Sequence, residues 1–136
     1  MAIQAKNPGK RSVDSLLDEA RADIDRYTVA QAFDYQQQGA LLIDIRPVAQ
    51  RVEHGVVPQA LVIERNVLEW RLDPQCDHRL PEISSYERRV VILCQQGYAS
   101  SFAAASLRAL GYQHVGDVIG GFDAWRAAGL PVQAEQ

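Results

Sequence analysis

Four short segments rich in apolar residues constrain the fold of this chain more than any other feature. They are residues 40–45, 60–63 and 90–93, with a weaker version at 114–119. Such runs, apolar on both sides of the strand, are typical of parallel sheets that are covered on both faces. Helical patterns lie between them. The sequence therefore predicts an α/β fold with a mainly parallel central sheet flanked by helices.

Apolar residues at helical spacing predict the intervening helices. They are expected over residues 12–25, 28–39, 66–72, 101–110 and 122–128. Ser12 and Thr28 are the expected N-caps of the first two helices. A glycine follows or ends three of these helices and favours a left-handed last turn. Residues 73–87, which contain two prolines, are expected to form an irregular excursion.

The length of the chain fits one compact domain. It has 136 residues, and domains cluster near roughly 100 to 150 residues. We expect a polar tail over residues 1–11, an N-terminal helix over 12–26, the main domain over 27–132 and a short tail over 133–136. The apolar face of the first helix needs a cover, which the same chain or a second copy in a homodimer would provide.

The charge balance excludes several classes of partner. Fourteen Lys and Arg against seventeen Asp and Glu give a net charge of -3, which does not suit a protein that binds the nucleic-acid backbone. The mean hydropathy of -0.20 and the absence of a long apolar run exclude a membrane span. The 47% hydrophobic content excludes disorder.

The cysteine content indicates a reducing compartment. The chain has only Cys76 and Cys94, too few for a secreted disulfide scaffold. Residues 1–10 are polar and lack the apolar segment of a secretory signal. The cytoplasm is the expected location.

Cys94 stands between the apolar run 90–93 and the helical pattern that begins near Ser101. In α/β sheets ligands bind beyond the carboxyl ends of the strands, and there a cysteine would face free backbone N–H groups and the positive end of a helix dipole. Such a site favours the thiolate, which is the nucleophilic form, and the same amides would hold an anion. The alternative is that Cys94 is a small core residue.

Three motifs resemble those of a known family. Residues 94–99, Cys-Gln-Gln-Gly-Tyr-Ala, match a six-residue active loop with cysteine first and glycine fourth. Asp44-Ile45-Arg46 with residues 55–60 resembles an early signature, and Gly-Gly-Phe-Asp-Ala-Trp at 120–125 resembles a closing one. Over residues 27–132 the chain resembles a single rhodanese domain, which implies the rhodanese-like three-layer fold.

The resemblance also implies a reaction. A rhodanese moves a sulfane sulfur from thiosulfate or a related donor to a thiol or cyanide through a persulfide, here on Cys94. The partners would be a small sulfur donor and a thiol acceptor, and no cofactor or metal is required. Backbone amides of the loop would bind the substrate; these residues are Gln95, Gln96, Gly97, Tyr98, Ala99 and Ser100.

Some positions depart from the family pattern. Many members have Arg, Thr or Ser where this chain has Ala99, and members specialised for thiosulfate often carry basic residues where Gln95 and Gln96 stand. A neutral loop favours a second hypothesis, a catalytically weak binding or regulatory module. A cysteine phosphatase is disfavoured, because its loop ends in an arginine where this chain has Ser100.

The remaining candidates have structural interpretations. Asp44 and Arg46 are expected to form a hydrogen-bonded pair that supports the turn after a buried strand. Trp125 is expected in the core, and the ring of Tyr98 either lines the pocket mouth or plays no part. Cys76 would either resolve an oxidised Cys94 or be a bystander.

Overall fold

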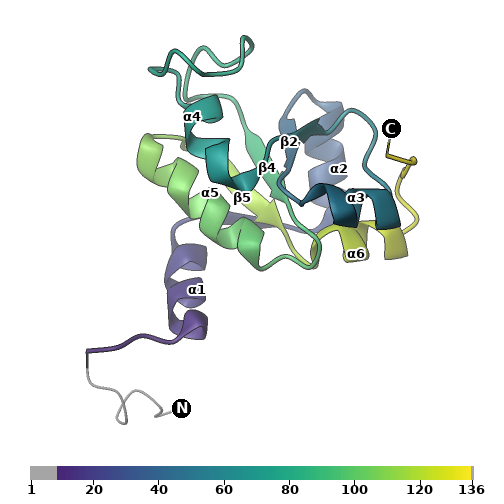
Figure 1. The fold of residues 1–136 in the computed structure, drawn as a ribbon, viewed down its shortest axis with the longest axis horizontal. Coiled ribbons are helices and arrows are strands. Elements are labelled where there is room, and N and C mark those ends of the chain that lie inside the picture. The colour runs from purple at the N-terminus through teal and green to yellow at the C-terminus, as the bar shows by residue number, and fades with distance from the viewer. Residues whose placement is uncertain (1–8, 136) are drawn as a thin grey trace.

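The fold is built around a five-stranded parallel sheet. The computed structural model describes residues 9–135, and its strands lie in the order β1-β5-β4-β2-β3 (Figure 1). The strands are β1 Asp25–Tyr27, β2 Leu41–Asp44, β3 Leu61–Val62, β4 Val90–Leu93 and β5 Val115–Val118. The predicted α/β fold with a parallel sheet is confirmed.

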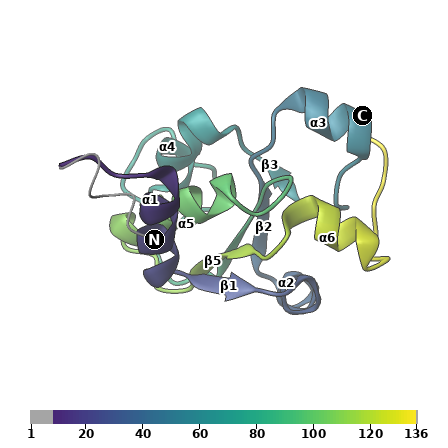
Figure 2. The ribbon, with the colours of Figure 1, turned by 90° about the horizontal axis from the view of Figure 1, so that it is seen from below.

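Helices cover both faces of this sheet. They are α1 Val13–Ala22, α2 Val29–Gln37, α3 Val48–His54, α4 Leu68–Leu72 after the short 3-10 turn η2 Arg65–Val67, α5 Ala99–Leu110 and α6 Gly121–Ala127. One core cluster joins the sheet to α4 and α5, and the other joins it to α2 and α6. The sheet therefore lies between two helical layers, as Figure 2 shows from below.

The central strands explain why the apolar runs were informative. All four residues of β2 and all four of β4 are buried. Along β4, Val90 and Ile92 face the α4 and α5 side, whereas Val91 and Leu93 face the α2 and α6 side. A strand that contributes to two cores has no polar face, so its sequence does not alternate.

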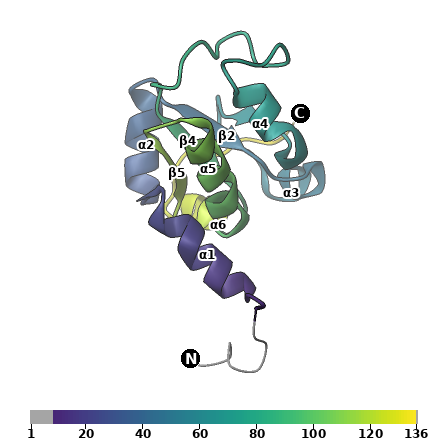
Figure 3. The ribbon, with the colours of Figure 1, turned by 90° about the vertical axis from the view of Figure 1, so that its left-hand side faces the viewer.

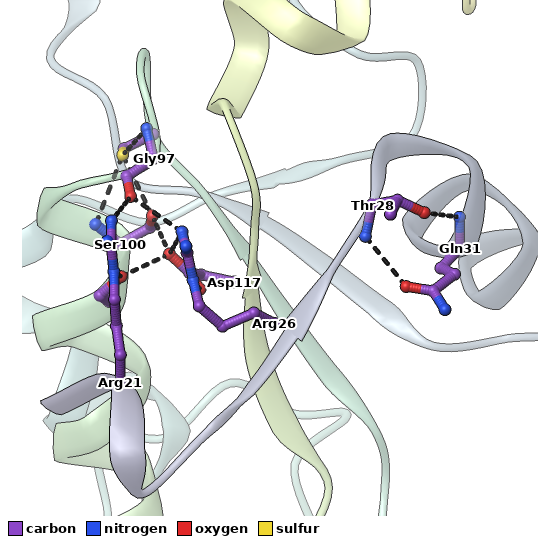
Figure 4. Close-up of polar contacts among 9 residues, drawn as sticks. Arg21, Arg26, Thr28, Gln31, Gly97, Ser100 and Asp117 are labelled. Carbon is purple, nitrogen blue, oxygen red and sulfur yellow. Dashed lines mark hydrogen bonds and ion pairs between the residues drawn. The ribbon is translucent and has the colours of Figure 1, made fainter. Parts of the chain in front are cut away.

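Two predicted helix caps are confirmed. The Ser12 hydroxyl oxygen accepts a hydrogen bond from the Ser15 N–H at 3.0 Å. Thr28 forms a capping box with Gln31, in which each side chain accepts the other residue's N–H at 3.1 and 3.0 Å (Figure 4). These bonds satisfy N–H groups that a helix start otherwise leaves free.

The segment before residue 27 differs from the expectation. The helix expected over 12–26 ends at Ala22, and residues 25–27 form β1, which pairs in parallel with β5. Gly116 in β5 allows this pairing, because a Cβ atom there would overlap the carbonyl oxygen of Asp25. The strand is short and polar, so no hydrophobic period reveals it.

Helix α3 was also not expected. It begins after Pro47, and its valines Val48 and Val52 are exposed. Its one buried side chain is that of Arg51, which donates to the Arg46 carbonyl oxygen at 2.7 Å. A helix without a buried apolar stripe gives no amphipathic signal in the sequence.

The chain covers the apolar face of α1 only in part, because Val13 and Leu16 are exposed. Leu17 and Ala20 are buried, and α1 packs on α5. Figure 3 shows α1 on the side of the molecule away from the excursion that follows α4. The homodimer that this face suggested stays a prediction. Among residues 9–135, the structure contains no helix that combines the length and apolar character of a membrane span.

Candidate active site

Cys94 directly follows β4 at the carboxyl edge of the sheet, with 7% of its surface exposed. The loop after it curls back over the sulfur. The N–H of Gly97 and the N–H of Ser100 donate to Cys94 Sγ at 3.2 and 3.3 Å. The Ser100 hydroxyl oxygen accepts from the thiol at 3.2 Å. Two amide dipoles thus point at the sulfur, an arrangement that favours negative charge on it.

Gly97 is required in this loop for two reasons. Its φ of +87° lies in the left-handed region that side chains disfavour. A Cβ atom there would lie 2.8 Å from the backbone nitrogen of Gly120. The fourth loop position therefore has both the dihedral angle and the close approach that only glycine permits.

The start of α6 supports the opposite side of the loop. The N–H of Phe122 donates to the carbonyl oxygen of Cys94 at 2.8 Å, and the N–H of Asp123 donates to that of Gln95 at 3.0 Å. A Cβ atom at Gly121 would lie 2.5 Å from the Cys94 carbonyl oxygen. The Gly-Gly pair at 120–121 lets the helix start approach the loop closely.

The predicted pair of Asp44 and Arg46 lies fully buried below the loop. Arg46 donates to both carboxylate oxygens of Asp44, and its shortest contact with that residue, to Oδ2, is 2.8 Å. It also donates to the Gly55 carbonyl oxygen at 2.8 Å. Its remaining terminal nitrogen donates to Gln95 Oε1 at 2.8 Å. The pair thus connects the strand end, the turn at Gly55 and the Cys94 loop.

A pocket of about 830 Å³ opens over Cys94. Four of the predicted loop residues line it: Gln95, Gln96, Tyr98 and Ala99. Gly97 and Ser100 are buried and do not line the pocket. The Tyr98 side chain is 58% exposed at the pocket edge, which places its ring at the mouth.

Basic side chains from other elements also line this pocket. Arg65 follows β3, His54 ends α3 and Arg126 lies in α6. Arg65 is paired with Glu69 at 3.0 Å, and Arg126 lies 3.9 Å from Asp123. Burial alone would raise the pKa of the Glu69 carboxyl. A hydrogen bond from the Ser106 hydroxyl and the positive charge of Arg65 outweigh burial, so the pKa of Glu69 lies below its ordinary value. The loop is neutral, but arginine side chains from other elements line the pocket.

Asp117 completes the layer below the loop and was missed in the sequence. It is fully buried in β5, and both Ser100 and Ser101 donate their hydroxyls to its Oδ2, at 2.7 and 2.8 Å (Figure 4). A carboxylate in a buried strand that ends at the same edge as the Cys94 strand was the available signal.

The family model of the rhodanese-like domain matches residues 27–128. The chain belongs to the rhodanese-like domain family. The match covers all three motifs, including the rhodanese loop that starts at Cys94 and the Gly-Gly sequence that supports it.

Curated relatives agree with this family. The chain is 31% identical over 105 residues to "Thiosulfate sulfurtransferase GlpE" of Haemophilus influenzae, covering 77% of this chain and 90% of that protein. It is 33% identical over 99 residues to "Sulfurtransferase" of Allochromatium vinosum, covering 73% and 83%. This rhodanese-like chain is accordingly a sulfurtransferase, and the predicted enzyme is confirmed.

Solved structures share the fold. One, from Rhodopseudomonas palustris, is described as a protein of unknown function and possible tyrosine phosphatase. It has a TM-score of 0.82 and 31% identity, covering 91% of this chain and 96% of that one. The thiosulfate sulfurtransferase of Pseudomonas aeruginosa has a TM-score of 0.64 and 24% identity, covering 82% of this chain and 19% of that one.

Cys76 lies on the side of the sheet where β4 and β5 begin, opposite to the side where Cys94 lies. It follows α4, whose last residue, Leu72, accepts a hydrogen bond from the Tyr112 hydroxyl at 2.8 Å just before β5 begins. Cys94 follows the far end of β4, a strand of four residues that spans roughly 13 Å. A disulfide needs Cα atoms within about 7 Å, so this fold does not support the resolving role considered for Cys76.

Proposed function

We propose that Cys94 carries the transferred sulfur as a persulfide. The single observation that supports this most directly is the pair of N–H groups, from Gly97 and Ser100, that donate to its sulfur at the base of an open pocket. A thiolate, a persulfide anion and the negative charge that develops during sulfur transfer would all be stabilised by the same two donors.

In the first half-reaction the Cys94 thiolate attacks the outer sulfur of thiosulfate. A bond forms between Cys94 Sγ and that sulfur, and the bond between the two sulfur atoms of thiosulfate breaks. The bonding electron pair leaves with sulfite. The enzyme then holds a persulfide anion, and its outer sulfur takes the place of the donor in the pocket.

In the second half-reaction an acceptor attacks the outer sulfur of the persulfide. A thiolate acceptor becomes a persulfide, and cyanide becomes thiocyanate. The bond between the two sulfur atoms on Cys94 breaks, and its electron pair returns to Cys94 as the thiolate. The atoms and electrons balance over the cycle without an external oxidant or reductant.

The other loop residues, and the pair of Asp44 and Arg46, have distinct proposed roles. Gln95, Gln96, Tyr98 and Ala99 line the pocket, where their backbone amides would bind the donor. Asp44 and Arg46 would act as structural support, because Arg46 reaches Gln95 from a buried ion pair.

An anionic donor suits the charge of the pocket. Arg65 and Arg126 line it together with Cys94, and both retain exposed surface. Thiosulfate carries two negative charges, so these cations would attract it in addition to the amides. The name of the Haemophilus influenzae relative supports the same donor.

The reducing compartment expected from the sequence is supported by the two cysteines, which are both free thiols. A Cys94 that must remain a thiolate between turnovers needs such surroundings. We therefore propose the cytoplasm as the location of the reaction. A Cys94 found oxidised in protein trapped rapidly from cells would contradict this location.

Intact mass measurement tests the persulfide. Purified protein is incubated with thiosulfate, freed of donor and weighed, and thiocyanate is followed after cyanide is added. We expect wild type and Cys76→Ser to gain one sulfur atom and Cys94→Ser to gain none. If Cys94→Ser turns over at the wild-type rate, Cys94 is not the carrier, and if wild type gains no sulfur, thiosulfate is not the donor.

A further inference from the structure

Two arginines from the segment before the family-matched residues reach the Cys94 loop. Arg21 lies in the last turn of α1 and Arg26 lies in β1, whereas the family match begins at residue 27. Each donates a guanidinium N–H to the carbonyl oxygen of Gly97, at 2.8 Å from Arg21 and 3.1 Å from Arg26 (Figure 4). One backbone oxygen of the loop therefore accepts two charged donors.

Each arginine is also anchored at the base of the loop. Nε of Arg21 donates to Ser101 Oγ at 3.0 Å. Nε of Arg26 donates to Asp117 Oδ1 at 3.0 Å, and the Ser101 hydroxyl donates to Oδ2 of the same carboxylate. Both guanidinium groups thus connect the outer part of the loop to the start of α5 and the end of β5, through the planar fork of donors that arginine has and lysine lacks.

The charge of Arg26 offsets that of a fully buried carboxylate. Asp117 has no exposed surface, and its ion pair with Arg26 is the one that compensates it among the described residues. Asp117 in turn accepts the hydroxyl hydrogen of Ser100 at 2.7 Å, while the N–H of Ser100 points at Cys94 Sγ. Arg26 is therefore connected to the reactive sulfur through two residues.

The contact with Gly97 fixes the residue of the loop with the greatest backbone freedom. Glycine loses more conformational freedom on folding than any other residue. With its carbonyl oxygen held by Arg21 and Arg26, Gly97 keeps its own N–H directed at Cys94 Sγ. The orientation of this donor thus depends on two side chains that lie outside the loop.

We propose that Arg21 and Arg26 are positioning residues for the sulfur transfer, and that the α1–β1 segment is part of the active site. The proposal deepens the proposed function and rests on it. The two guanidinium groups hold the Gly97 and Ser100 amides against the sulfur. Loss of the Arg21 group leaves the fold in place but slows every reaction that needs negative charge on Cys94, whereas loss of the Arg26 group also leaves Asp117 buried without its partner.

The other charged and titratable groups around Cys94 are the same in every variant. Asp44 and Arg46 lie at the end of β2 and just after it, His54 lies in α3, Arg65 lies in η2, and Asp123 and Arg126 lie in α6. Asp117 stays on the β5 side. A change in the pH dependence of Cys94 reactivity then reports on the substituted arginine.

The first variant is Arg21→Gln, which leaves the pair of Arg26 and Asp117 intact. Its matched control is Arg108→Gln, which removes the same charge and a similar contact, from a guanidinium to the Gln113 carbonyl oxygen. Arg108 lies in the last turn of α5, a helix of 12 residues whose other end carries the loop, so roughly 15 Å separate it from Cys94. All variants carry Cys76→Ser, so that Cys94 is the only thiol.

Two rates are measured. Iodoacetamide, which is uncharged, reports alkylation of Cys94 as a function of pH, and rapid mixing with thiosulfate reports sulfur loading in a single turnover. We expect Arg21→Gln to load sulfur on the order of tenfold more slowly than the control, and the midpoint of its alkylation profile to move to higher pH. Arg108→Gln should match the parent in both. Equal rates and equal midpoints in Arg21→Gln and the control overturn the proposal.

Arg26 provides a second test, with thermal unfolding measured in parallel. Arg26→Lys keeps a charge for Asp117 but lacks the two separate nitrogens with which Arg26 contacts Asp117 and the Gly97 oxygen. We expect it to fold, to regain part of the alkylation rate lost in Arg26→Gln, and to load sulfur more slowly than the parent. Full wild-type rates in Arg26→Lys mean that charge alone acts, which overturns the positioning role of Arg26.

The two proposals fail in different ways. If wild type loads no sulfur but Arg21→Gln still shows the shifted alkylation profile, the positioning role holds and the proposed donor is wrong. If wild type loads sulfur and Arg21→Gln loads it as fast as the control, the proposed function stands and the role of the α1–β1 segment is rejected.

Discussion

The guanidinium carbon of Arg46 lies 4.1 Å from the centroid of the Phe122 ring. Arg46 ends the first motif of the domain and Phe122 belongs to the last, so this stacking contact joins the two through the space below the Cys94 loop. Because both side chains are buried, the contact forms in a desolvated site where such interactions are strongest. The motifs that resemble the family in sequence are thus one packed unit in space.

Replacing Arg46 should destabilise the fold strongly. Arg46→Met leaves the Asp44 carboxylate buried without its partner, and such a loss costs about 3 kcal/mol or more. Urea unfolding followed by circular dichroism measures the free energy. The control is Arg11→Met, which breaks an exposed pair with Glu19 and should change stability by less than about 0.5 kcal/mol. A similar small effect at Arg46 would contradict the structural role.

Gly97→Ala should remove activity with a moderate loss of stability. The substitution places a Cβ atom 2.8 Å from the Gly120 nitrogen at a φ of +87°, and we expect a cost of about 1–3 kcal/mol. Gly39→Ala is the matched control, because Gly39 also has a positive φ but open space around it. Sulfur loading should vanish in Gly97→Ala and persist in Gly39→Ala. Normal loading in Gly97→Ala would show that the loop does not need this conformation.

The pocket arginines should affect donor binding more than turnover. Arg126→Gln and Arg65→Gln each remove one partly exposed charge, so the KM for thiosulfate should rise roughly threefold while kcat changes little. Raising the ionic strength should reduce the difference from wild type, because salt screens exposed charges. An unchanged KM at low salt would exclude these residues from donor binding.

Stability should fall between pH 10 and pH 12. Burial raises the pKa of Tyr112 to about 12, with Tyr86 and Asp73 adding to the shift. An unfolded chain releases this proton near pH 10, so the stabilisation present below pH 10 is lost as the pH rises toward the folded value. In Tyr112→Phe, urea midpoints should be lower at pH 8, because the hydrogen bond to Leu72 is gone, but should decline less steeply above pH 10. Identical slopes would contradict the raised pKa.

The parts of the fold that depend on local pattern could be predicted from the sequence. The buried strands β2 and β4, the caps at Ser12 and Thr28 and the glycine of the Cys94 loop all carry their signal in a few consecutive residues. Strand β1 could not be predicted, because its pairing depends on a glycine about 90 residues away.

The candidate site follows the same division. Cys94 and its loop are contiguous, so the sequence indicated them. Arg65, Arg126 and Asp117 come from three separate elements and meet only in the folded chain. The sequence therefore indicated a neutral loop, whereas the pocket over it is also lined by Arg65 and Arg126, which lie outside the three motifs.

The location of the two thiols at opposite edges of the sheet determines what happens when Cys94 is oxidised. A sulfenic acid formed there has no second cysteine of the same chain within reach to condense with, so recovery depends on a thiol from solution. Prolonged peroxide exposure without an added thiol should therefore drive Cys94 to the irreversible sulfinic acid. A thiol acceptor in the surroundings would protect the enzyme as well as discharge it.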